Sequence, residues 1–160
     1  MMKQRAQEHR PGLNRLRALW AEGRCALGAI ATIPSVPVVQ VLARSGLDFI
    51  LIDMEHGPIG PAEAHAMIVA TAGTPLVPLA RVAATTPWHA KVPLDLGAMG
   101  VCFPLVSTRA DAEAAVRAVR YPPLGLHILM GASAPQKVAN MMDNLERGLI
   151  APTEIVARAV

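Results

Sequence analysis

The stretch FILIDMEHGPIG, residues Phe49–Gly60, decides the fold. Its first half is a short, almost continuously apolar run, and turn residues follow it. That pattern is typical of a parallel β-strand that is buried on both faces. Asp53, Glu55 and His56 stand where the strand ends. A charged cluster at this point is either a solvated turn or part of a site, and the stretch alone leaves both readings open.

The segments on either side of this strand repeat one pattern, in which a strand is followed by a helix at intervals of roughly 20 to 25 residues. Ser35 and Thr86 are predicted helix N-caps, and Pro87 is suited to the first position of its helix. The sequence predicts helices at 13–21, 35–46, 60–73, 85–99 and 107–120, and strands at 26–33, 48–54, 74–82 and 100–106.

Strands that alternate with helices predict an α/β fold with a parallel sheet and right-handed crossovers. A doubly wound nucleotide-binding sheet is disfavoured, because the turn ATIPSVP after the first strand contains no glycine. The remaining architecture is a (β/α)₈ barrel, in which polar residues at the carboxyl ends of the strands meet on one face. Asp53, Glu55 and His56 follow the second strand, and Arg81 ends the third.

These side chains suit proton transfer and the stabilisation of negative charge. An imidazole can accept a hydroxyl proton near neutral pH, particularly when a carboxylate fixes its tautomer, and His56 with Asp53 meets that need. Arg81 can stabilise negative charge that develops on a substrate oxygen. The alternative is structural: the cluster could be a solvated turn, and Arg81 could form an ion pair with Glu55 or Asp95.

Composition restricts the function classes. The chain has 160 residues, 52% of them hydrophobic and only 3% aromatic, which predicts one domain with an aliphatic core. The net charge is +3 and the arginines are scattered outside the leader MMKQRAQEHRPGLNRLR, so we expect no nucleic-acid partner. No apolar run is long enough for a membrane span or a signal peptide, which predicts a cytoplasmic protein without a membrane partner. Cys25 and Cys102 lack metal-ligand spacing and are expected to remain thiols with packing roles.

Five blocks of the sequence, in order, resemble the HpcH/HpaI family of metal-dependent pyruvate aldolases: FILIDMEHGP, PLARV, PW, LDLGAMGVCFPLV and AEAAVRAVRYPPLG. The resemblance covers residues 13–125. It implies a (β/α)₈ barrel and a class II aldehyde-lyase, which cleaves a 4-hydroxy-2-oxo acid to pyruvate and an aldehyde with a divalent metal ion (Mg, Mn or Co). It also implies catalytic roles for His56 as the group that handles the hydroxyl proton and for Asp53 as the carboxylate that orients it. Arg81 would bind the oxygen of the substrate that becomes the enolate.

The sequence departs from that pattern after Gly125. A complete barrel takes about 250 residues, so we expect residues 1–125 to form about four β/α units of a partial barrel. Residues 126–160 are expected to be a non-matching tail with helices at 135–148 and 153–160, from foreign or out-of-frame sequence or a deletion junction. We identify no metal ligand, because the family carboxylates are not found and Asp143, Glu146 and Glu154 lie on these tail helices.

Three functions therefore stay open: an aldolase of the family type, a truncated and inactive relative, and a non-enzymatic assembly partner. Weak metal binding by the isolated chain is expected, since the two usual carboxylates are not found. The open edges of a partial barrel also predict a homo-oligomer.

Overall fold

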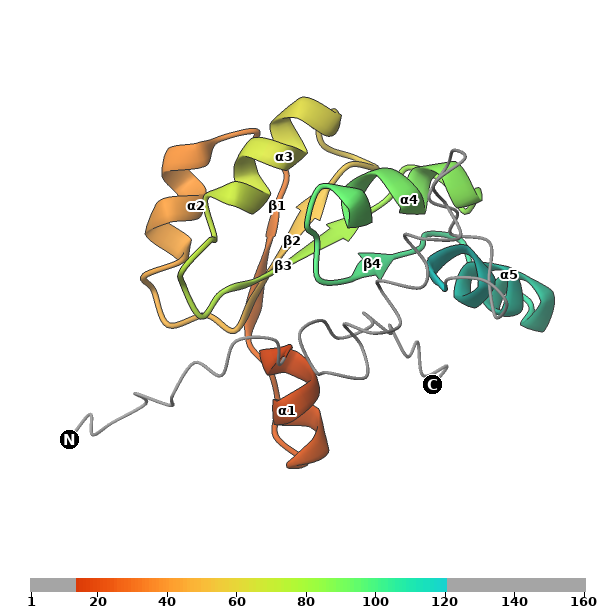
Figure 1. Cartoon of the computed structure of the whole chain (residues 1–160), viewed down its shortest axis with the longest axis horizontal. Helices are drawn as coiled ribbons and strands as arrows, with labels where there is room; N and C mark the ends of the chain where they lie inside the picture. The colour runs from red at the N-terminus through yellow and green to blue at the C-terminus, as the bar shows by residue number, and fades with distance from the viewer. Residues whose placement is uncertain (1–13, 121–160) are drawn as a thin grey trace, which may run out of the picture.

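The computed structural model describes residues 14–120, in which strands and helices alternate along the chain (Figure 1). The sequence prediction of four β/α units preceded by a helix is confirmed. The elements are α1 (Arg15–Ala21), β1 (Gly28–Ala31), α2 (Val36–Leu42), β2 (Phe49–Asp53), α3 (Pro61–Val69), β3 (Val77–Arg81), α4 (Pro87–Asp95), β4 (Val101–Cys102) and α5 (Arg109–Val119).

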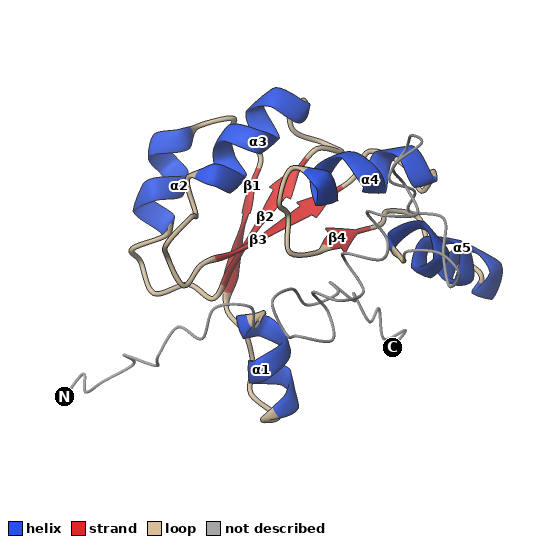
Figure 2. Ribbon diagram, viewed as in Figure 1, coloured by secondary structure: helices blue, strands red, loops and turns tan. Residues whose placement is uncertain are grey.

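The four strands form one parallel sheet in the order β1-β2-β3-β4 (Figure 2). Strands that are neighbours in the sequence are therefore neighbours in the sheet, as in a β/α barrel and unlike a doubly wound sheet. The carboxyl ends of β2 and β3 are in register, because Asp53 pairs with Arg81. Every strand thus delivers its last residues to the same edge.

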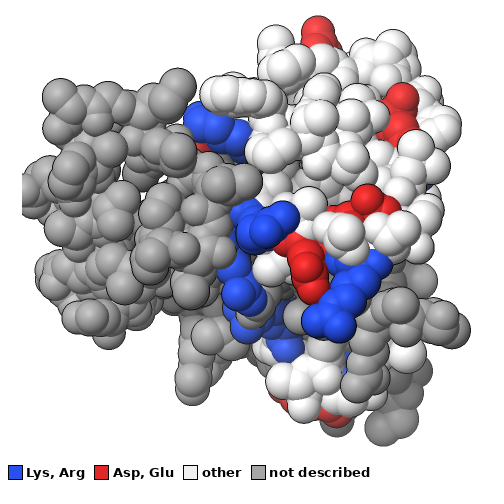
Figure 3. Space-filling view, turned by 90° about the vertical axis from the view of Figure 1, so that its right-hand side faces the viewer, with Lys and Arg blue, Asp and Glu red and all other residues white. Residues whose placement is uncertain are grey.

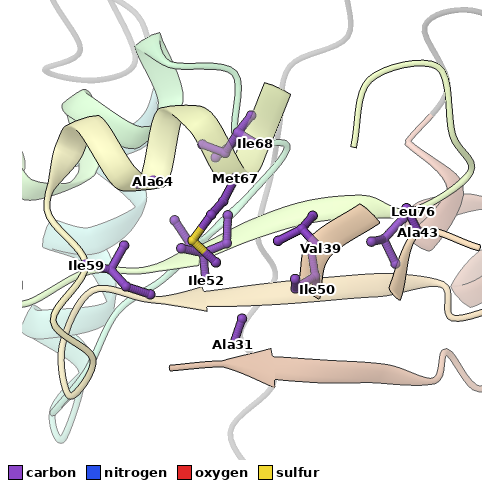
Figure 4. Packing of buried hydrophobic residues seen from close by; sticks show 12 residues of the cluster. Ala31, Val39, Ala43, Ile50, Ile52, Ile59, Ala64, Met67, Ile68 and Leu76 are labelled. Carbon is purple, nitrogen blue, oxygen red and sulfur yellow. The ribbon is translucent and has the colours of Figure 1, made fainter. Parts of the chain in front are cut away.

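One face of the sheet packs against α2 and α3. Alternate residues of β2, Ile50 and Ile52, are fully buried and contact the helix residues Val39 and Met67 (Figure 4). Small side chains such as Ala64 let the helices approach the strands closely, which explains why the core is aliphatic with few aromatic residues. The whole cluster comprises Ala31, Val39, Ala43, Ile50, Ile52, Ile59, Ala64, Met67, Ile68, Leu76, Ala80 and Ala98.

The opposite face is built in layers, as the period of two in a strand requires. Gly28 pairs with Phe49, and a Cβ atom at Gly28 would lie 2.5 Å from the Phe49 ring. The ring therefore fills the space that the glycine leaves. The next layer along the strands contains Ile30, Leu51 and Leu79, and Ile30 is 60% exposed. The layer at the carboxyl ends of the strands is charged rather than apolar, since it contains Asp53 and Arg81.

Helix α1 lies at the end of the sheet where the strands begin (Figure 2). The side chain of Arg15 donates to the buried carboxylate of Asp48 at 2.7 Å, and Asp48 also accepts from the Leu27 backbone N–H at 2.9 Å. The Asn14 side chain donates to the Met99 carbonyl at 3.0 Å. These contacts attach α1 to the amino ends of the strands, opposite the edge where Asp53 and Arg81 lie.

Two details differ from the sequence prediction. The fourth strand ends at Cys102, although the pattern predicts 100–106, because Pro104 has no N–H to donate and Leu105 adopts a left-handed φ of 55°. Thr86 is the N-cap residue of α4, but its hydroxyl makes no capping bond and lies 2.6 Å from Nδ1 of His89. Ser35 caps α2 as predicted.

The predicted tail helices, with Asp143, Glu146 and Glu154, lie outside the described residues. No helix within residues 14–120 is long and apolar enough to span a membrane. The face of α4 and α5 carries mixed charge, with acidic beside basic side chains (Figure 3). Lys91 pairs with Asp95 on α4, and Arg109 pairs with Glu113 on α5.

Candidate active site

The turn after β2 is shaped by Asp53. Its Oδ1 atom accepts hydrogen bonds from the backbone N–H groups of Glu55 at 3.0 Å and His56 at 3.2 Å. Gly57 then passes so close to the strands that a Cβ there would lie 2.6 Å from the Asp53 carbonyl oxygen and 3.0 Å from that of Thr32. Only glycine fits this passage without a shift of the backbone. The turn thereby presents the side chains of Glu55 and His56 at the rim.

Arg81 forms a bidentate ion pair with Asp53. Its Nε and Nη2 atoms donate to Oδ1 and Oδ2 of Asp53 at 2.9 and 2.5 Å. The Asp53 side chain is fully buried and that of Arg81 is 27% exposed, so the pair is covered on the acid side and open on the arginine side. The third nitrogen of the fork, Nη1, has no acceptor among residues 14–120.

The ion pair changes the proton affinity of both partners. Hydrogen bonds from Arg81 lower the pKa of Asp53 to about 2, against the opposing effect of burial, and the backbone N–H groups of His56 and Glu55 add to the lowering. The same contact raises the pKa of Arg81. Both groups are therefore charged near neutral pH, and the guanidinium is held in one orientation.

Glu55 lies between Arg81 and His56. Its Oε2 atom is 3.3 Å from Nε of Arg81 and 3.5 Å from Nδ1 of His56. The side chain of Glu55 is 18% exposed, whereas that of His56 is 65% exposed. An acid, an imidazole and a guanidinium thus meet at the carboxyl ends of β2 and β3, the edge where barrel enzymes carry their sites.

The three residues singled out from the sequence, Asp53, His56 and Arg81, are brought together at one rim. One expected contact is corrected: the Asp53 carboxylate bonds the backbone N–H of His56 rather than its ring, because Arg81 takes both carboxylate oxygens. The structural alternative is also present in part, since Arg81 pairs with Glu55, while Asp95 pairs with Lys91. An ion pair and a site role are compatible here, because Nη1 of Arg81 has no acceptor in the part of the chain that the structure describes.

Cys102 is a rim residue that the sequence analysis assigned to packing. It pairs in register with Arg81, and it keeps contact with solvent. Partial burial raises the pKa of its thiol, against the lowering effect of the Arg81 charge. A strand of only two residues has no periodic pattern, so only the backbone pairing places Cys102 beside Arg81.

Asp53, Glu55 and His56 form a possible metal-binding group, since one ligand atom from each lies within 4.8 Å of the others. Mg²⁺ and Mn²⁺ prefer oxygen ligands in a near-octahedral shell. However, the Arg81 guanidinium already lies against both carboxylates, and a second cation at that place would be repelled. The three side chains therefore do not fit a resident divalent ion while Arg81 keeps this position.

Comparison with known proteins agrees with this architecture. The family model described as HpcH/HpaI aldolase/citrate lyase matches residues 34–157. A hydroxypyruvate/pyruvate aldolase of Sagittula stellata is 36% identical over 134 residues, which are 84% of this chain and 53% of that protein. A 4-hydroxy-2-oxo-heptane-1,7-dioate aldolase of Escherichia coli is 34% identical over 71% of this chain and 44% of its own length. The chain spans about half the length of these curated relatives.

A solved structure supports the same fold. The HpcH/HpaI aldolase/citrate lyase family protein from Burkholderia cenocepacia J2315 superimposes with a TM-score of 0.71 at 31% identity, over 87% of this chain and 58% of that one. The four-stranded sheet thus corresponds to part of a barrel. The family match runs on to residue 157, across most of the segment that the sequence analysis set apart at residue 126. That division stays a prediction.

Proposed function

This chain belongs to the HpcH/HpaI aldolase/citrate lyase family, and on that basis we propose that it carries out retro-aldol cleavage of a 4-hydroxy-2-oxo acid. The products are pyruvate and an aldehyde. The observation that carries the proposal is the rim itself: the guanidinium of Arg81, whose Nη1 has no acceptor among the described residues, and the exposed imidazole of His56 share Glu55 as a neighbour. The names of the two relatives, both aldolases of small oxo acids, support the same substrate class.

Each rim residue has one task in this reaction. His56 accepts the proton of the 4-hydroxyl group as the C3–C4 bond breaks and the aldehyde forms. The electron pair of that bond becomes the enolate of pyruvate, with negative charge on the C2 oxygen. Arg81 binds that oxygen through Nη1 and stabilises the charge. A proton returned to C3 completes pyruvate. Asp53 keeps the guanidinium in place and charged.

Charge balance adds a requirement. With a neutral imidazole, the two carboxylates and one guanidinium sum to a net charge of −1, which disfavours an anionic substrate. The divalent metal ion of this proposal, Mg²⁺, Mn²⁺ or Co²⁺, would supply the missing positive charge, with ligands other than these three side chains. Assembly into a homo-oligomer belongs to the same proposal, since the exposed side chains of Ile30 in β1 and of the flanking Leu27 and Ile33 would gain cover. A cytoplasmic location is part of the proposal as well.

The test is pyruvate release from a 4-hydroxy-2-oxo acid in the presence of added Mn²⁺ or Mg²⁺. We expect Arg81→Ala to lower the rate by roughly 10²-fold or more and His56→Ala by roughly 10²- to 10⁴-fold. Matched controls are Arg109→Ala and His65→Ala, because both residues are exposed on helices and neither belongs to the rim cluster of Asp53, Glu55, His56 and Arg81. Equal rates in all five proteins would reject the assigned roles. No pyruvate release by a folded parent would favour an inactive relative or an assembly partner.

A further inference from the structure

The imidazole of His56 lacks the packing that usually fixes a catalytic ring. Its side chain is 65% exposed, so neighbouring apolar groups restrict it little. A ring that is free to rotate presents its basic nitrogen in many directions, and it also exchanges between two neutral tautomers. Some polar partner must therefore orient the ring if it is to accept a proton at one position.

Asp53 cannot be that partner. Its Oδ1 atom accepts from Arg81 and from two backbone N–H groups, and its Oδ2 atom accepts from Arg81. The buried carboxylate is thus committed to the guanidinium and the turn, and it reaches His56 only through the backbone.

Glu55 has the required position. Its Oε2 atom lies 3.5 Å from Nδ1 of His56, slightly beyond hydrogen-bond length, and the 65% exposed ring has room to turn towards it. The same oxygen lies 3.3 Å from Nε of Arg81, which limits the movement of the acid. A carboxylate at Nδ1 favours the tautomer with hydrogen on Nδ1 and leaves the Nε2 lone pair free to act as the base.

We propose that Glu55 is the positioning residue of this site: its Oε2 atom holds the Nδ1–H tautomer of His56 and thereby sets the orientation of the base. Its catalytic consequence rests on the proposed function, whereas its structural part concerns the ring alone. Arg81 is expected to keep its bidentate bond to Asp53 when Glu55 is changed, although Glu55→Ala also removes the 3.3 Å contact with Arg81 Nε, so the tautomer of His56 is the readout that isolates the effect on the ring.

The direct test is the tautomer of His56, measured by long-range ¹H–¹⁵N NMR of the full chain at about pH 8, where an ordinary imidazole is neutral. The His56→Ala spectrum identifies the ring signals. The parent is expected to show mainly Nδ1–H, Glu55→Gln to retain it through the amide oxygen, and Glu55→Ala to shift towards Nε2–H. Glu113→Gln, on the exposed face of α5, serves as the control and is expected to match the parent. The same tautomer ratio in the parent and in Glu55→Ala would overturn the proposal.

Kinetics supply the second readout. In the pyruvate-release assay, Glu55→Ala should lower kcat at least about tenfold, a part of the roughly 10²- to 10⁴-fold that proton transfer supplies. KM should change less, since substrate binding by Arg81 is retained, and Glu55→Gln should restore part of kcat. A larger effect on KM than on kcat would contradict the role. If the parent releases no pyruvate, the proposed function fails, but the tautomer measurement still decides whether Glu55 orients the ring.

Discussion

Replacing Asp53 by Asn tests the ion pair on which the rim is built. Asn has nearly the same size but no charge, and its amide group cannot accept both bonds from Arg81. In the native chain the pKa of Asp53 is lowered from 3.8 to about 2. At 1.36 kcal/mol for each pKa unit, that difference corresponds to about 2 kcal/mol of unfolding free energy at neutral pH. We expect Asp53→Asn to lose at least that amount at pH 7.

The sign of the pH dependence follows from the direction of the shift. Because the pKa is lower in the folded state, the unfolded state binds more protons between about pH 2 and pH 4. The contribution of Asp53 to the unfolding free energy is therefore complete above about pH 5 and is lost as the pH falls towards 2. At pH 3 the parent should have lost about 1 kcal/mol of it, and the difference between parent and variant should narrow by that amount.

Urea denaturation followed by circular dichroism gives the two free energies at pH 7, 5, 4 and 3. Comparing the parent with Asp53→Asn at each pH removes the contributions of the other carboxylates. Glu113→Gln serves as the control, because it breaks an exposed ion pair that is expected to contribute no more than about 0.5 kcal/mol. A loss in Asp53→Asn below about 0.5 kcal/mol at pH 7, or a difference that is the same at pH 7 and pH 3, would refute the reasoning.

Three further outcomes follow from the packing. Met67→Ala, in the core between α3 and the sheet, should lower the unfolding free energy by about 2 to 5 kcal/mol in the same urea titration. Val69 lies on the same helix but is 54% exposed, so Val69→Ala should change that free energy by no more than about 0.5 kcal/mol. Gly57→Ala should destabilise the chain by at least about 1 kcal/mol and slow pyruvate release, since its Cβ meets backbone oxygens; a variant with native stability and rate would show that the turn can shift. In the Cys25→Ser variant, the rate at which Cys102 reacts with iodoacetamide should rise with pH around a midpoint above that of an ordinary thiol, because partial burial raises its pKa, and a 2-oxo acid should protect it; a midpoint at or below that of an ordinary thiol would contradict the raised pKa.

Much of this arrangement could be predicted from the residue pattern. The apolar run before Asp53 indicates a buried parallel strand, and parallel strands bring their carboxyl ends to one edge, so Asp53 and Arg81 had to lie close together. The choice of partners could not be predicted in the same way. Whether Asp53 contacts the imidazole of His56 or the guanidinium of Arg81 depends on differences of a few ångströms in side-chain position. In the structure, Arg81 on the adjacent strand donates to both carboxylate oxygens.

The remaining features depend on the backbone path. The sequence around Cys102 does not show whether its side chain lies at the rim or in the core, because a strand of two residues is too short for an alternating apolar and polar pattern. Gly57 is similar, since a glycine in a turn usually indicates a positive φ, whereas here the glycine is needed because the chain passes against two carbonyl oxygens. The position of Cys102 and the need for glycine at position 57 can be recognised only from the three-dimensional structure.

The pairing of Asp53, Arg81 and Cys102 across three strands has a consequence for protein engineering. Backbone hydrogen bonds fix the spacing of these positions at about 4.8 Å per strand, whatever side chains occupy them. A library that randomises the loop after β3, between Arg81 and α4, can therefore vary the surroundings of the rim without moving these positions or replacing Glu55 and His56. Mutations that stabilise the outer surfaces of α2 and α3 can be added independently, because those helices contact the sheet from its other face. The chain thus offers separate sets of positions for selecting substrate range and for selecting thermal tolerance.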